Sequence, residues 1–304
     1  MVLPGRRSQL NRIKRKSVPP NVYLDQNALI YLHNQSAGDG TFKAKILQAI
    51  GHGGFIVVLS PWHWVETART KDLQKASQLG EFIDWLNPIW LRDRRDLEAL
   101  EVRESFFTFA RVPFRRPASL VTRTELLSAM NGVELTPATT PSSREFVEGW
   151  IKKPGMMEPL IKSQLQNADA LKSLRAAIAS GKLTAAIKAE GDQKLIAGFL
   201  PNTTPNGVVI DDETKRSYLN TVTPKVFPTL AIESAVAEYS WDNQGRIDWN
   251  SMVDKFHLIP ALHYTDLVIS DDGYFQLLLP VAKKTGFVKA SVLKFADFCK
   301  SFLQ

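Results

Sequence analysis

The chain has 304 residues, of which 44% are hydrophobic and 23% charged, and these ordinary proportions exclude a largely disordered or collagen-like protein. Lys and Arg outnumber Asp and Glu by 38 to 31, and the resulting net charge of +7 suits an anionic partner such as nucleic acid without requiring one. The single cysteine, Cys299, excludes an intramolecular disulfide and a zinc site built from several cysteines.

Residues 1–20 are expected to form a flexible basic arm that either contacts phosphate or is simply solvated. The basic residues of this arm are Arg6, Arg7, Arg12, Lys14, Arg15 and Lys16. The arm lacks the apolar core of a signal peptide, and no run in the chain approaches the roughly 18 apolar residues of a membrane span. We therefore expect a cytoplasmic protein with no membrane partner.

Residues 21–108 alternate short apolar runs with longer helical patterns. The runs are continuously apolar, as in parallel sheets that are buried on both faces. Strands are predicted at residues 22–25, 55–59 and 89–91. Helices are predicted at residues 27–34, 41–51, 61–70, 71–86 and 93–108, the third opening with Ser60 as cap and Pro61 in its first turn.

The composition changes at residues 109–225, which we interpret as a mostly helical insertion. Proline-rich loops at 137–143 and 201–207 separate helices that are predicted at 145–151, 159–179 and 183–199. An arginine cluster near the start of this region is a candidate nucleic-acid-binding surface, and a solvated face is the alternative. Its members are Arg111, Arg115, Arg116 and Arg123.

The α/β pattern resumes at residues 226–304. Helices are predicted at 228–240, 249–263, 274–284 and 290–303, with a strand at 267–270 and a last edge strand at 287–288. Residues 21–108 and 226–304 are therefore expected to form one α/β domain that residues 109–225 interrupt.

Acidic residues recur near the ends of these predicted strands. Asp25 ends the first strand, Glu66 follows the second, and the pair Asp271-Asp272 ends the strand at 267–270, while Asp254 lies in a helix. The carboxyl edge of a parallel sheet is where ligand sites form. Carboxylates gathered there repel one another unless a divalent cation joins them, and oxygen ligands suit Mg²⁺ or Mn²⁺.

Each acid also has an ordinary structural interpretation. Asp25 could be a helix cap, Glu66 and Asp254 could be solvated helix residues, and the pair Asp271-Asp272 could form a turn. The sequence contains no G-x-S-x-G, Walker A or His-Glu-x-x-His motif, so these other catalytic chemistries have no support. The pattern favours metal-dependent phosphodiester hydrolysis, which needs converging carboxylates and no protein nucleophile.

The acidic segments resemble those of the PIN-domain nucleases. Residues 22–27 are similar to the opening strand of that family, residues 59–66 to its second strand and following helix, and residues 269–272 to the strand that ends in hydroxyl-x-Asp. The resemblance implies four metal ligands, Asp25, Glu66, Asp254 and Asp272, with Asp271 as the substitute for Asp272 and Asp266 competing with Asp254. The supporting residues would be Asn27, Ser270, Asp271, Asp266 and His257. His257 shares a helix face with Asp254, and a hydrogen-bonded core histidine is its alternative interpretation.

The resemblance also implies a fold and an activity. The fold would be a three-layer α/β/α sandwich with a central, mostly parallel sheet, plus the helical insertion. The activity would be Mg²⁺- or Mn²⁺-dependent cleavage of nucleic acid, with RNA favoured over DNA only because many family members cleave RNA. Some members are toxins with antitoxin partners, so an inhibitory or oligomeric protein partner is open. The alternatives are a non-catalytic scaffold that binds RNA or protein, and a phosphatase acting on small substrates.

Overall fold

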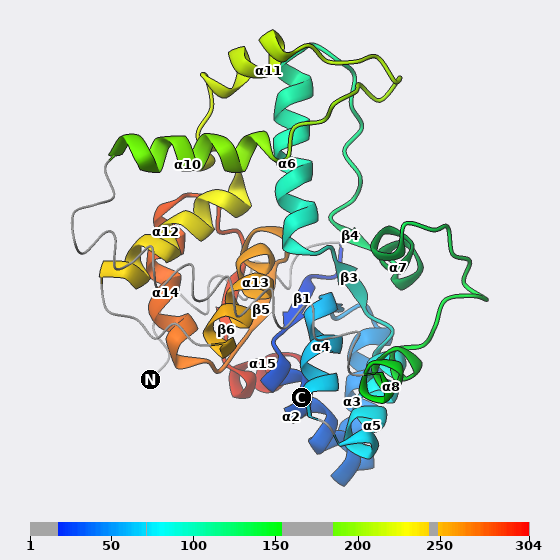
Figure 1. Ribbon diagram of the computed structural model, residues 1–304. Coiled ribbons are helices and arrows are strands. Elements are labelled where there is room, and N and C mark those ends of the chain that lie inside the picture. Colours follow the sequence, from blue (N-terminus) through cyan, green and yellow to red (C-terminus); the bar gives the residue numbers. More distant parts are fainter. Residues whose placement is uncertain (1–17, 71, 154–184, 243–248, 304) are drawn as a thin grey trace.

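The computed structural model describes residues 18–70, 72–153, 185–242 and 249–303, and it describes side chains in these ranges except at 185–189, 240–242, 249–256 and 274. The described strands form a six-stranded sheet with the order β4-β3-β2-β1-β5-β6 (Figure 1). All neighbouring strands are parallel except β3 and β4. The strands are β1 (Asn21–Leu24), β2 (Ile56–Leu59), β3 (Ile89–Leu91), β4 (Leu120–Val121), β5 (Leu267–Ile269) and β6 (Ser291–Leu293). The predicted α/β class and mostly parallel sheet are confirmed.

The strand order places a topological switch point beside β1. From β1 the chain moves outward through β2 and β3 on one side, and β5 and β6 lie on the other side. In the register, Leu24 lies opposite Ile269, and Val22 lies between Val57 and Leu267. The residues that follow β1, β2 and β5 therefore share one edge of the sheet, at the position where open α/β sheets form ligand sites.

Side chains alternate between the two faces along each strand, so each strand contributes to two apolar clusters. Val22, Leu24 and Val57 belong to one cluster, and Tyr23 and Val58 belong to the other. The first cluster also contains residues of α2 (Gln26–Gly38), α3 (Gly40–Gly51), α4 (Pro61–Arg69), α5 (Leu73–Leu86), α7 (Arg123–Asn131), α8 (Ser143–Lys152) and α15 (Phe295–Phe302). The second contains residues of α6 (Arg94–Phe109), α12 (Pro228–Asp242), α13 (Trp249–Tyr264) and α14 (Gly273–Lys284).

The described residues of the segment 109–225 lie in two places. Its first part joins the main body, because β4 pairs with β3 and α8 packs against α4 and α5. Its second part contains α10 (Ala185–Ala197), α11 (Asp212–Leu219) and the short 3-10 helix η2 (Pro224–Val226). Figure 1 shows α10 and α11 beside α6, away from the sheet. These elements share a third apolar cluster with α6, in which Phe106, Ile196 and Tyr218 are buried.

Several predicted boundaries were wrong. The last edge strand is β6 at Ser291–Leu293 and not residues 287–288, and the closing helix begins at Phe295 and not at residue 290. The reason is tertiary, since the Ser291 N–H donates to the Asp266 carbonyl and extends the parallel ladder with β5. The elements β4, α7 and α11 were not predicted from the sequence. Residues 1–17 of the basic arm and the predicted helix at 159–179 lie outside the described residues.

None of the helices in the described part of the chain is long and apolar enough to cross a membrane.

Candidate functional site at the carboxyl edge of the sheet

Asp25 occupies the centre of the carboxyl edge. Its backbone N–H donates to the Ile269 carbonyl at 3.0 Å, which continues the pairing of β1 with β5. Its carboxylate Oδ1 accepts from the Ala28 N–H at 2.6 Å and so caps α2, as the structural interpretation of this residue predicted. The side chain is only 4% exposed. A carboxylate has two oxygens and about four acceptor positions, so capping is compatible with a second role.

His63 ties the start of α4 to the end of β1. Its Nδ1 accepts from the Ser60 N–H at 3.0 Å, and its Nε2 lies 2.7 Å from the carbonyl of Leu24, the residue before Asp25. Because Nδ1 is the acceptor, the proton is on Nε2 and is donated to that carbonyl. Complete burial and the nearby His257 lower the pKa of His63 to about 3, so the ring is neutral.

Glu66 lies one turn further along α4, near a buried chain of polar side chains. The Tyr23 hydroxyl lies 2.9 Å from the Ser60 hydroxyl and 2.8 Å from His257 Nδ1. His257 Nε2 is 3.8 Å from Glu66 Oε2, while the Glu66 side chain is 17% exposed. Glu66 is therefore a partly buried acid beside a buried histidine, and not a solvated helix residue.

The residues after β5 lie at the same edge of the sheet. Ser270 is buried, and its hydroxyl accepts from the Asp272 N–H at 3.2 Å. Asp272 is half-buried and caps α14, because its Oδ1 accepts from the Phe275 N–H at 2.6 Å. Asp271 is exposed, and its Oδ1 accepts from the Phe295 N–H at 3.3 Å. Asp271 and Asp272 thus accept backbone hydrogen bonds at a turn and at a helix start, as expected of acids with a structural role.

Two predicted supporting residues, Asp266 and Asn27, are placed differently from the acids at this edge. Asp266 precedes β5, so it lies at the opposite, amino edge of the sheet, where its Oδ2 accepts from the Asn21 N–H at 2.9 Å. Asp266 therefore lies apart from Asp25, Ser270 and the other residues that follow the strands at the carboxyl edge. Asn27 lies in the first turn of α2 but is exposed, and the neighbouring Gln26 instead donates from Nε2 to the Thr67 hydroxyl of α4 at 3.2 Å.

Asp254 lies on α13, one turn before His257, in the part of that helix whose side chains are not described. Within the described part of the chain, no three Asp, Glu, His or Cys side chains are grouped closely enough to hold a metal ion. Of the four predicted metal ligands, Asp25, Glu66 and Asp272 lie on neighbouring elements at the carboxyl edge.

The four arginines do not form one solvent-facing cluster. Arg116 Nη1 lies 2.8 Å from Glu104 Oε2, and its guanidinium covers the Tyr264 ring. Arg123 forms an ion pair with Asp84. Two members of the predicted arginine surface therefore pair with acidic residues of neighbouring helices. The remaining two arginines, Arg111 and Arg115, are exposed.

A second group of buried charges joins α6 to α12. Arg94 pairs with Glu98 on its own helix and with Glu233 on α12. Burial raises the pKa of Glu98 to about 8, although the neighbouring Arg94 opposes the shift. Burial alone would raise the pKa of Glu233 as well, but the ion pair with Arg94 lowers it. Sequence patterns do not predict these contacts, because Arg94 and Glu98 have the spacing of an ordinary surface pair.

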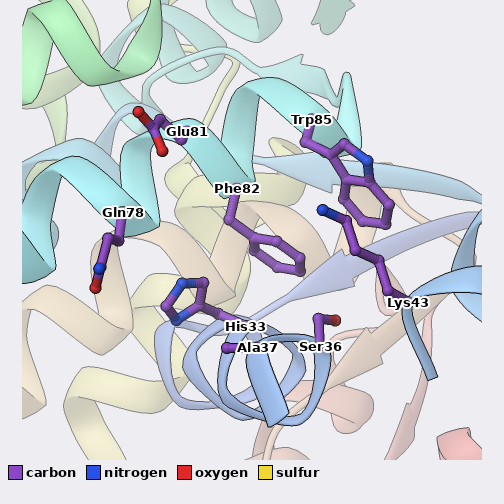
Figure 2. A pocket seen from close by; sticks show the side chains of 8 residues that line it. All are labelled: His33, Ser36, Ala37, Lys43, Gln78, Glu81, Phe82 and Trp85. Atoms are coloured by element: carbon purple, nitrogen blue, oxygen red, sulfur yellow. The ribbon is translucent and has the colours of Figure 1, made fainter. Parts of the chain in front are cut away.

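A hollow of about 280 Å³ lies away from these acids, between α2, α3 and α5 (Figure 2). Figure 2 shows the Phe82 ring between the His33 ring and the Trp85 side chain, with Lys43 beside the indole. None of the predicted site residues lines this hollow.

Comparisons of the chain with family models, with curated proteins and with solved structures found no match.

Proposed function

We propose that the chain is a Mg²⁺- or Mn²⁺-dependent nuclease with a PIN-like, three-layer α/β/α fold, and that it cleaves RNA. The observation that carries this proposal is the position of Asp25. A buried carboxylate follows the central strand at the switch point of a mostly parallel sheet, with Glu66 and Asp272 on the adjoining elements. The preference for RNA rests on the resemblance to the PIN-domain family alone.

The residues at this edge offer oxygen donors, which are the ligands that Mg²⁺ and Mn²⁺ prefer. Asp25, Glu66 and Asp272 would hold the metal, together with Asp254, whose place on α13 is one turn before the histidine that faces Glu66. The bound metal would supply a hydroxide-like water and neutralise charge on the phosphate. The chain itself would fix the acids, since helix capping restrains Asp25 and Asp272.

The test is cleavage of labelled single-stranded RNA and DNA in Mn²⁺, Mg²⁺ or EDTA by the wild type and by Asp25→Asn. The amide oxygen of asparagine can still cap α2, so this variant removes the charge and keeps the helix start. We expect cleavage to require metal and to fall on the order of 100-fold or more, because bound metals contribute several kcal/mol to such reactions.

The matched control is Asp39→Asn, because Asp39 caps α3 in the same way but is exposed and lies at the opposite end of α2 from Asp25. This variant should cleave like the wild type. Metal-dependent cleavage that survives in Asp25→Asn would contradict the assignment of the site.

A non-catalytic scaffold is the second candidate, and one observation favours it. Asp25, Asp271 and Asp272 each accept a backbone hydrogen bond at the start of a helix, so all three have a structural reason to be acidic. A scaffold without a metal site would bind nucleic acid in EDTA as well as in Mn²⁺. It would also gain no thermal stability from Mn²⁺, whereas a ligand that binds the folded state raises the unfolding temperature.

A further inference from the structure

We propose that Tyr23 is a positioning residue, which acts through His257 to hold the Glu66 carboxylate for metal binding. This inference rests on the proposed function, because it assigns a role toward the same metal site. It concerns a tyrosine inside a strand, where the sequence pattern indicated only core packing.

The Tyr23 hydroxyl has hydrogen-bond partners on two other elements. Its oxygen lies 2.9 Å from the Ser60 hydroxyl, which itself lies 3.3 Å from His63 Nδ1. The same Tyr23 oxygen lies 2.8 Å from His257 Nδ1. The other ring nitrogen of His257, Nε2, lies 3.8 Å from Glu66 Oε2, which is within ion-pair distance but beyond hydrogen-bond distance. The Tyr23 hydroxyl thus holds one side of the ring whose other side lies beside the acid.

The three rings pack against one another and are buried from solvent. The centroid distances are 5.4 Å from Tyr23 to His63, 5.9 Å from Tyr23 to His257 and 5.7 Å from His63 to His257. His257 is 1% exposed. Hydrogen bonds in such a dry environment are stronger and more restrictive than in water. The Tyr23 hydroxyl therefore fixes the rotation of the His257 ring.

These polar contacts connect three elements of the fold. Tyr23 lies on β1, Ser60 and Glu66 flank the start of α4, and His257 lies on α13. Groups that orient metal ligands from outside the coordination shell change metal affinity about 10- to 100-fold when they are removed. A phenylalanine at position 23 would fill the same space without the cost of burying a hydroxyl. Apolar packing alone therefore does not require the Tyr23 hydroxyl.

The experiment is Mn²⁺ binding to the full chain by titration calorimetry, with Tyr23→Phe as the variant. We expect the Mn²⁺ dissociation constant to rise about 10- to 100-fold. The matched control is Tyr264→Phe, which removes a partly buried tyrosine hydroxyl that donates to Glu101 at 2.6 Å, away from the predicted site. The control should lose a similar hydrogen bond and keep the Mn²⁺ affinity of the wild type.

A double-mutant cycle with Glu66→Gln tests whether Tyr23 acts through the acid. If it does, Tyr23→Phe should no longer change Mn²⁺ affinity once the Glu66 charge is removed. Wild-type Mn²⁺ affinity in Tyr23→Phe, or an equal loss in Tyr264→Phe, would overturn the inference and leave the proposed function standing. A wild type that neither binds Mn²⁺ nor cleaves would overturn both, and the two failures are therefore distinguishable.

Discussion

At the scale of single residues, the acids of the site have two roles that a substitution can separate. Asp25 and Asp272 each accept a backbone N–H at 2.6 Å and so begin a helix. Capping needs an acceptor oxygen, which asparagine also has, whereas metal binding needs the negative charge. Replacement by asparagine therefore tests the charge, and replacement by alanine tests the cap.

For Asp272, we expect alanine to lower the free energy of unfolding by about 1 kcal/mol, through the lost cap of α14. Asparagine should keep the free energy of unfolding within a few tenths of a kcal/mol of the wild-type value. If Asp272 is a metal ligand, both variants should lose metal-dependent cleavage. Chemical denaturation together with the cleavage assay would measure this, and an active Asp272→Asn would reduce the residue to its capping role.

At the scale of elements, α5 and α8 approach one another closely because α5 carries a glycine at the contact. A Cβ atom at Gly80 would lie 2.7 Å from the Arg144 Cα and 2.9 Å from its nitrogen, both of which are backbone atoms. Asp84 of α5 also accepts from the Ser143 N–H at the start of α8, at 2.9 Å. This packing brings residues 143–152 into the main body, although they had been assigned to the insertion.

We expect Gly80→Ala to destabilise the protein by about 1 to 3 kcal/mol through this clash, which exceeds the roughly 1 kcal/mol that alanine gains in a helix. Gly149→Ala on α8 is the control, because a Cβ there meets no atom within 4 Å. That change should stabilise by roughly 0.5 to 1 kcal/mol. Urea unfolding of both variants checks the prediction, and equal stability of the two would contradict the close approach.

At the scale of the whole molecule, α6 joins the sheet to the cluster of α10 and α11. Its first turns carry the buried ionisable residues Arg94 and Glu98, and its far end carries Phe106 and Phe107 of the third cluster. Because the ionisable groups lie between α6 and α12, their protonation affects how the main body holds together as the pH changes.

The raised pKa of Glu98 predicts a dependence of stability on pH. Glu98 has a pKa near 4.5 in the unfolded chain and about 8 in the folded protein, so the folded state binds more protons between these values. The stability that protonated Glu98 contributes is then fully present below the unfolded-state pKa of 4.5. It is lost as the pH rises toward the folded-state pKa of about 8.

Glu98→Gln replaces the carboxyl group with a neutral group of the same shape. The free energy of unfolding of this variant should therefore fall less than that of the wild type between about pH 4.5 and 8. Urea titrations at several pH values from about 4.5 to 8 would measure the difference. Parallel stability curves for the two proteins would show that Glu98 is already ionised in the folded state.

The sequence by itself determined the local features of this protein. Continuous apolar runs fixed β1, β2 and β5 as strands buried on both faces, and the serine and proline at 60 and 61 fixed the start of α4. It also placed Asp25, Ser270, Asp271 and Asp272 just after their strands. These features depend on neighbouring residues along the chain, so a local pattern is enough to predict them.

Only the tertiary structure decided which distant residues meet. The two-residue strand β4 exists because β3 pairs with it. Asp266 lies at the amino edge of the sheet because β5 begins at Leu267, opposite Val22, which places Asp266 beside Asn21. Likewise, the contact of Tyr23 with His257 joins residues that are 234 positions apart. No spacing along the chain encodes such contacts, because they are set by strand order and by the packing of helices on the two faces of the sheet.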